Sequence, residues 1–147
     1  MSNFKKILIP TDGSEYTQKA ITQGLEIARV MGAEVTALYV VDQTSFVNFP
    51  MDSTVVSIYS LLEKEGQDAV DHVVEEGARV GVKVTPLVQE GSPVKRIVEL
   101  AKDHDLVVMG TLGRTGISKI LLGSVAERVV RFAPTPVLVV RSNIQEE

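Results

Sequence analysis

Cysteine is absent from the 147-residue chain, so disulfides, thiolate metal sites and cysteine nucleophiles are excluded. Positive charge is not in excess either, because 15 Lys and Arg stand against 19 Asp and Glu, a net charge of −4. A general nucleic-acid-binding protein needs a basic stripe that neutralises phosphates, and we therefore expect no nucleic-acid partner. A single bound nucleotide needs only local positive potential, which this balance permits.

A long apolar run is also missing. The apolar stretch within the opening MSNFKKILIP is too short for a signal peptide or a membrane span. We therefore expect a soluble, cytoplasmic protein with no membrane partner. Hydrophobic residues make up 44% and charged residues 23%, as in globular domains, and the length suits one domain over residues 1–147 with a frayed tail at 142–147.

Recognisable catalytic patterns are missing too. The nucleophile motif G-x-S-x-G does not occur, and no serine has an identifiable base partner. His72 lies in a charged segment and His104 ends a predicted helix, so we expect both to be solvated rather than catalytic. Asp103, His104 and Asp105 look like a metal trio, but neighbours at a helix-to-strand junction point in different directions. We assign no catalytic residue and no protein metal site.

The chain does contain a regular alternation of apolar strand-like segments and amphipathic helical segments. Predicted strands cover residues 5–10, 34–41, 83–88, 106–109 and 136–141. Predicted helices run from the turn at 11–15 to Gly32, over 55–80, from Ser92-Pro93 through Ala101, and from Ser124 through Ala133. Residues 42–54, which include Phe46 and Phe49, read as an irregular connection. This alternation predicts the α/β class, with a parallel sheet covered by helices on both faces.

The most informative stretch is 105–131, which reads as a buried strand, a glycine-punctuated loop and an amphipathic helix. Glycines at 110, 113, 116 and 123 allow the backbone to approach a ligand closely, and Ser124 is predicted to be the helix N-cap. The first N–H groups of a helix lack internal partners and carry partial positive charge, which favours anions. Arg114 and Lys119 add cationic side chains. The loop is therefore a candidate phosphate site.

A structural reading of the same residues stands beside the functional one. The glycines could only make turns, Ser124 could only cap its helix, and Asp12 could be a turn aspartate. Val40 and Met109 would be core residues with or without a ligand. The phosphate-loop pattern G-x-x-x-x-G-K-[ST] and the dinucleotide pattern G-x-G-x-x-G both fail.

The spacing Gly110, two residues, Gly113, nine residues, Gly123-Ser124 closely resembles the ATP-binding branch of the universal stress protein family. The flanking VVMG and SVAERVV agree, as do Ile9-Pro10-Thr11-Asp12, Tyr39-Val40-Val41-Asp42 and the final PTPVLVV. The resemblance implies a Rossmann-like, adenine nucleotide alpha hydrolase-like fold, an open five-stranded sheet in the order 3-2-1-4-5. The Asp12 turn and the Gly110 loop would then meet at the switch point between strands 1 and 4.

The resemblance also implies a set of nucleotide-binding residues. Asp12 would lie beside ribose and adenine, Val40 would contact adenine through its main chain, and Met109 and Gly110 would line the nucleoside side. Phosphates would be bound by N–H groups and the serine hydroxyl of Gly113, Gly123, Ser124 and Val125. Pro10 and Thr11 belong to the same opening motif, and Arg114 either contacts phosphate or faces solvent. Leu112 replaces a histidine or arginine of many relatives. The cofactor would be ATP, ADP or AMP, with Mg²⁺ or Mn²⁺ on the phosphates.

Three functions follow as hypotheses. The first is an ATP-binding, nucleotide-responsive stress-survival factor. The second is a slow ATPase or phosphotransferase, and the third is an interaction module without nucleotide. A homodimer is expected through the last strand, Val137, Leu138, Val139 and Val140, because an apolar edge strand invites pairing with a second copy.

Overall fold

The computed structural model describes residues 4–43, 50–111 and 122–142. The strands are β1 (Lys6–Pro10), β2 (Glu34–Asp42), β3 (Val84–Gly91), β4 (Leu106–Gly110) and β5 (Val137–Val140). The helices are α1 (Gln18–Met31), α2 (Ser53–Arg79), α3 (Pro93–Ala101) and α4 (Ser124–Phe132), with a short 3-10 turn, η1 (Glu15–Thr17), before α1.

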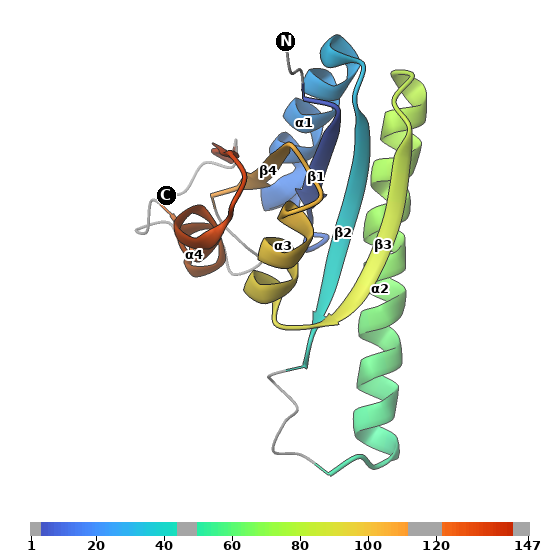
Figure 1. Cartoon of the computed structure of the whole chain (residues 1–147). Coiled ribbons are helices and arrows are strands. Elements are labelled where there is room, and N and C mark those ends of the chain that lie inside the picture. Colours follow the sequence, from blue (N-terminus) through green and yellow to red (C-terminus); the bar gives the residue numbers. More distant parts are fainter. Residues whose placement is uncertain (1–3, 44–49, 112–121, 143–147) are drawn as a thin grey trace, which may run out of the picture.

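The five strands form one parallel sheet in the order β3-β2-β1-β4-β5 (Figure 1). Leu8 pairs with Thr36 of β2 on one side and with Val107 of β4 on the other. The predicted fold class and strand order are confirmed. The order reverses between β1 and β4, so their carboxyl ends open the crevice that parallel sheets use for ligands.

Alternation along the central strands divides the core into two layers. Ile7 and Ile9 face a cluster completed by α1 and α2, whereas Leu8 faces a cluster completed by α3 and α4. All three side chains are fully buried. A strand covered on both faces has no polar alternation, which is why β1 and β4 read as continuous apolar runs.

Two predicted helix starts were wrong by a small margin. Helix α2 begins at Ser53 rather than Val55, because the Asp52 carboxylate accepts hydrogen bonds from the N–H groups of Thr54 and Val55 at 3.0 and 3.1 Å. Helix α4 has Gly123 as its N-cap, with an extended backbone at φ −65° and ψ 162°, so Ser124 is the first helical residue rather than the cap. The aromatics Phe46 and Phe49 lie outside the described residues.

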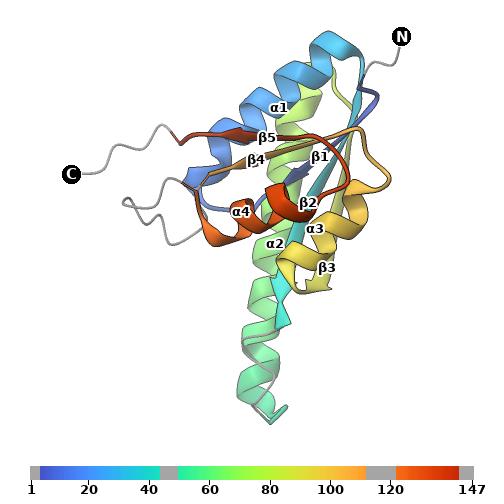
Figure 2. The same cartoon turned by 60° about the vertical axis from the view of Figure 1, so that its left-hand side comes forward.

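Helix α2 is much longer than the strands it covers. Its carboxyl-terminal part packs on β2 and β3, while its amino-terminal part extends beyond the sheet, below the rest of the molecule (Figures 1 and 2). Within the described part of the chain, no helix combines the length and the apolar character that crossing a membrane requires.

Candidate functional site

A cavity of about 530 Å³ opens at the carboxyl ends of β1, β2 and β4. This volume lies within the usual range of small-molecule sites. One wall comes from the turn after β1, a second from the end of β2, and a third from the end of β4 with the start of α4. The cavity therefore lies at the reversal of strand order.

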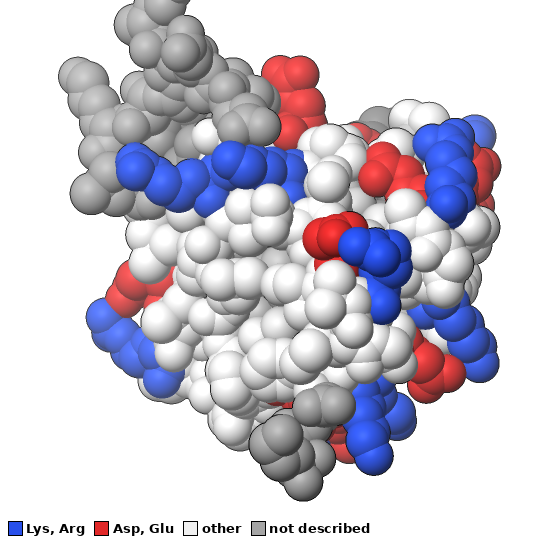
Figure 3. Space-filling model, turned by 90° about the horizontal axis from the view of Figure 1, so that it is seen from above, with Lys and Arg blue, Asp and Glu red and all other residues white. Residues whose placement is uncertain are grey.

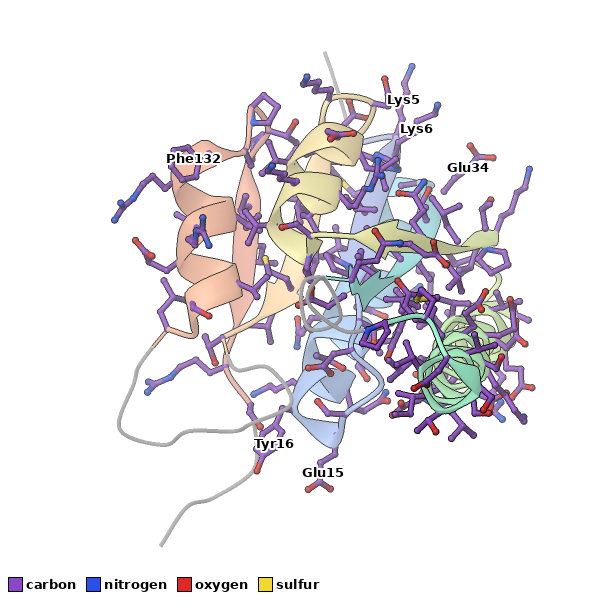
Figure 4. The ribbon with its side chains drawn as sticks, turned by 90° about the horizontal axis from the view of Figure 1, so that it is seen from below. Lys5, Lys6, Glu15, Tyr16, Glu34 and Phe132 are labelled. Carbon is purple, nitrogen blue, oxygen red and sulfur yellow. The ribbon has the colours of Figure 1, made fainter. Side chains whose placement is uncertain are left out.

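The turn after β1 is held by its own polar side chains. The Asp12 Oδ1 accepts hydrogen bonds from the Ser14 N–H at 2.9 Å and the Ser14 hydroxyl at 2.6 Å. Gly13 occupies φ +80°, which an L-residue adopts only with strain. The turn leads into η1, whose Glu15 and Tyr16 side chains point away from the sheet (Figure 4). Asp12 is thus a turn-stabilising aspartate as well as a cavity residue.

Two buried threonines fix the same turn from below. Thr17 donates its hydroxyl hydrogen to the Ser14 carbonyl at 2.9 Å, so its oxygen accepts from the Thr11 hydroxyl at 3.2 Å. The Thr11 oxygen in turn accepts from the Gly13 N–H at 3.1 Å. Thr11 and Thr17 line the cavity floor, with exposed fractions of 7% and 6%. Both of their hydroxyl hydrogens are used in the hydrogen bonds just described. They position the turn rather than supply donors to a ligand.

The start of α4 presents main-chain N–H groups at the opposite wall. Ser124, Val125 and Ala126 precede Glu127, whose N–H makes the first bond of the helix, to the Gly123 carbonyl at 2.9 Å. The three preceding N–H groups therefore have no partner within the helix, and all three residues line the cavity. Such a terminus attracts negative charge.

The N–H of Gly123 is used differently. It donates to the Thr111 carbonyl at 2.6 Å, while the Thr111 N–H donates to the Val140 carbonyl of β5 at 3.1 Å. The end of β4 and the start of α4 are thereby joined directly. The predicted phosphate contact of the Gly123 N–H is thus occupied by the protein in this structure.

The rest of the lining is mostly apolar. Leu38, Met109 and Ile97 contribute side chains from β2, β4 and α3, and Leu62 contributes one from α2. Val40 lies at the end of β2, where strand β1 no longer runs beside it. An apolar slot at this place suits a flat hydrophobic ring.

Charge in the lining is entirely negative as far as the structure describes it. Asp12 and Asp42 line the cavity, and no lysine, arginine or histidine among the described residues does so. Arg114 and Gly113, which were predicted to bind phosphate, lie outside the described residues. A polyphosphate in this cavity would therefore depend on the α4 amides, on a metal ion, or on residues outside the described ranges.

The predicted site residues within the described ranges come together in this one cavity. They are Pro10, Thr11, Asp12, Val40, Met109, Gly110, Gly123, Ser124 and Val125. Ten further lining residues were not predicted as site residues: Thr17, Leu38, Tyr39, Val41, Asp42, Leu62, Pro93, Ile97, Thr111 and Ala126. Half of them come from helices, and nothing in their local pattern distinguishes a residue facing a cavity from one facing the core.

The two histidines are engaged elsewhere. His104 donates from Nδ1 to the Leu100 carbonyl at 2.7 Å, and its Nε2 accepts from the Thr36 hydroxyl at 2.9 Å. The expectation that His104 is solvated was therefore wrong, because its half-buried ring joins α3 to β2. His72 Nε2 contacts Gln18 Oε1 at 2.9 Å and Glu76 Oε1 at 2.7 Å. Neither ring lines the cavity.

Comparisons with known proteins agree with this architecture. Universal stress protein MJ0531 of Methanocaldococcus jannaschii is 47% identical over 145 residues, covering 97% of this chain and 85% of that protein. The solved structure of MJ0577 from the same organism shares 31% identity, covers 98% of this chain and 100% of its own, and superposes with a TM-score of 0.82. A universal stress protein solved in complex with cAMP shares 25% identity over 97% of this chain and 100% of its own, with a TM-score of 0.69.

The model of the universal stress protein family matches residues 3–141, nearly the full length of the chain. The match includes every strand of the sheet and all the residues described around the cavity. The chain therefore belongs to the universal stress protein family.

Proposed function

We propose that this protein binds an adenine nucleotide, ATP in particular, in the cavity between β1 and β4, and that occupancy regulates a role in stress survival. The observation that carries the proposal is the position of the α4 amino terminus. The three residues whose N–H groups lack helical partners line the same cavity as the apolar residues at the end of β2. The cAMP complex of a relative supports the same ligand class.

The geometry divides the ligand between the two walls. The base would occupy the apolar region near Val40 and Met109, and the phosphates would approach Ser124 and Val125. Because Asp12 and Asp42 are the charged lining residues described, a polyphosphate would gain from a divalent ion. Mg²⁺ or Mn²⁺ would be held mainly by phosphate oxygens, with a carboxylate such as Asp12 available as an oxygen ligand.

A matched pair of substitutions at Ser124 tests the amide contribution. Ser124→Ala removes the hydroxyl, whereas Ser124→Pro removes both the hydroxyl and the N–H. Proline suits this first helical position, and the extended Gly123 before it has the backbone that proline requires. We expect ATP affinity in magnesium buffer to fall about threefold for Ser124→Ala and at least about tenfold for Ser124→Pro, measured by calorimetry on nucleotide-stripped protein.

The control is Ser92→Ala, at the N-cap of α3 outside the cavity lining, which should leave ATP affinity unchanged. Circular dichroism establishes that each variant is folded. Absence of saturable ATP binding by the wild-type protein would reject the proposal. Equal affinities for Ser124→Pro and wild type would reject the assigned role of the α4 terminus.

The polar groups of the cavity favour a regulatory role for the bound nucleotide over its hydrolysis. The Asp12 Oδ1 already accepts two hydrogen bonds from Ser14, which hold it as part of the turn. An ATPase would need a residue that orients water toward the γ-phosphate. Multiple turnovers that are lost in Asp12→Asn with binding retained would replace the proposed role by catalysis.

We further propose a homodimer through β5. The two sheet edges differ, because β3 contains Pro86, which cannot donate a ladder hydrogen bond, whereas β5 is Val137–Val140 without proline or charge. Leu138 within β5 and Phe132 at the end of α4 expose 38% and 58% of their surface. Figure 3, a view from above, shows a broad area of uncharged residues with charged side chains around it and one acidic and basic group within it. A two-fold contact would cover this edge with itself.

A further inference from the structure

The amino-terminal part of α2 carries exposed apolar side chains that the proposed nucleotide site does not use. We call Met51, which lies just before the helix, and Val56, Ile58 and Leu61 within it the α2 tip. Their exposed fractions are 68%, 48%, 40% and 67%. In Figures 1 and 2 this part of α2 extends past the carboxyl ends of the strands. The tip is thus a projection and not part of the sheet packing.

The apolar residues of this segment are not confined to the side that faces the protein. Val55 is buried and Leu62 lines the cavity, yet Val56, Ile58 and Leu61 on other sides of the same helix are exposed. A surface helix normally has one apolar stripe, and a helix that is apolar on several sides is normally covered. The segment therefore has the composition of a helix that packs against a further surface.

Charge indicates what that surface would be. Residues 52–71 contain five carboxylates and one lysine, all of them exposed: Asp52, Glu63, Lys64, Glu65, Asp68 and Asp71. The net charge of this segment is −4, equal to the net charge of the whole chain, so the remaining residues hold equal numbers of each sign. A second copy would bring the same negative segment against itself, whereas a basic partner would be attracted.

We propose that the α2 tip docks a basic amphipathic helix of a partner protein. The partner's apolar stripe would cover Ile58 and Leu61, and its lysines or arginines would lie along Glu65 and Asp68, which share that side of the helix. This is helix-against-helix recognition with apolar anchors and a charged rim. Leu62, next to Leu61 in the helix, lines the cavity, so the docking surface borders the proposed nucleotide site.

Binding of defined peptides to the full-length, nucleotide-free protein tests this surface. The probe is a fluorescent Leu/Lys peptide of about 18 residues with leucines at helical spacing, followed by anisotropy. The comparison peptides replace every lysine by glutamate or scramble the order. We expect saturable binding of the Leu/Lys helix, weakened by raising salt to about 0.5 M, and much weaker binding of both comparison peptides.

Matched variants locate the binding. Leu61→Ser and Glu65→Lys should each reduce affinity for the Leu/Lys helix about tenfold. Val30→Ser, at a site on α1 with a nearly equal exposed fraction of 68%, and Asp103→Lys, at an exposed site after α3, should leave it unchanged. Because Leu61 is 67% exposed, its replacement should not disturb folding. The salt series tests the charge contribution on the wild-type protein, so it does not depend on any variant.

Three results would overturn the proposal. The first is equal binding of the lysine and glutamate peptides. The second is an equal effect of the tip variants and their controls. The third is a wild-type oligomer that Leu61→Ser dissociates in sedimentation velocity, which would assign the tip to a second copy. None of these readouts requires nucleotide, so failure here leaves the proposed ligand of the cavity standing.

Discussion

Asp105 sits where β4 begins, beside the start of β1, and its carboxylate joins the two strands. Its Oδ2 accepts the N–H groups of both Lys5 and Lys6 at 2.9 Å. These two backbone hydrogen bonds hold the pKa of Asp105 below its ordinary value of 3.8, and the bond from Lys5 has the larger effect. Ionised Asp105 therefore stabilises the folded chain at neutral pH, and protonation removes this contribution.

Replacing Asp105 by Asn should lower stability at pH 7 by about 0.5–1 kcal/mol, an estimate reduced for the exposure of the group. Since the folded pKa is depressed, the wild-type contribution is complete above about pH 5 and is lost as the pH falls through and below 3.8. The difference between wild type and variant in urea unfolding should therefore shrink between about pH 5 and pH 3. A difference that stays constant over this range would contradict the assignment.

Single residues also mark the limit of sequence reasoning. Asp12 and Ser124 could be singled out because turn and helix-start chemistry is local. Thr17 could not, because its role depends on Thr11 across the turn and on burial of both hydroxyls. The N-cap position of Gly123 was missed for a similar reason. Serine has the stronger preference for the N-cap position. Here, however, Gly123 holds that position in the extended conformation, and its N–H donates to the Thr111 carbonyl.

At the scale of elements, the approach of α2 to β2 depends on one glycine. A Cβ built at Gly66 would lie 2.5 Å from Cδ1 and 2.9 Å from Cε1 of Tyr39. Tyr39 is buried, with an exposed fraction of 5%, and it also lines the cavity. The helix therefore lies against the ring itself, without an intervening side chain.

Gly66→Ala should destabilise the protein by about 1–2 kcal/mol, because overpacking outweighs the gain in helix propensity. The melting temperature should fall by about 4 °C. Displacement of Tyr39 should also weaken nucleotide binding. Gln67→Ala, on the exposed side of the same turn, makes no clash and removes only a surface hydrogen bond to Asp71, so it should be nearly neutral. A variant at Gly66 as stable as that control would show that the ring can move aside.

Element types were predictable from periodicity, but lengths were less so. Strands β2 and β3 continue to Asp42 and Gly91, beyond the predicted ends, because the two strands pair with each other past the end of β1. No local pattern signals such an extension, since it depends on the neighbouring strand. The strand order came from the family resemblance and not from alternation, which permits several orders.

For the whole molecule, the central expectation is the proposed two-fold contact at β5. Leu138→Lys should convert a dimer into a monomer in sedimentation equilibrium, because a charge would be placed on the edge that the second copy covers. Val80→Lys, after α2 and with a similar exposed fraction of 41% against 38%, should leave the mass unchanged. A dimer that survives Leu138→Lys would exclude β5 as the contact.

The hydrogen bond between Thr111 and Gly123 has a consequence for how such a site can diversify. It fastens both ends of the intervening segment at one point, and Thr111 is itself tied to β5. The sheet and α4 are thereby insulated from whatever length or composition the segment between them has. Substitutions, insertions or deletions between Thr111 and Gly123 should therefore leave the positions of the sheet and α4 unchanged.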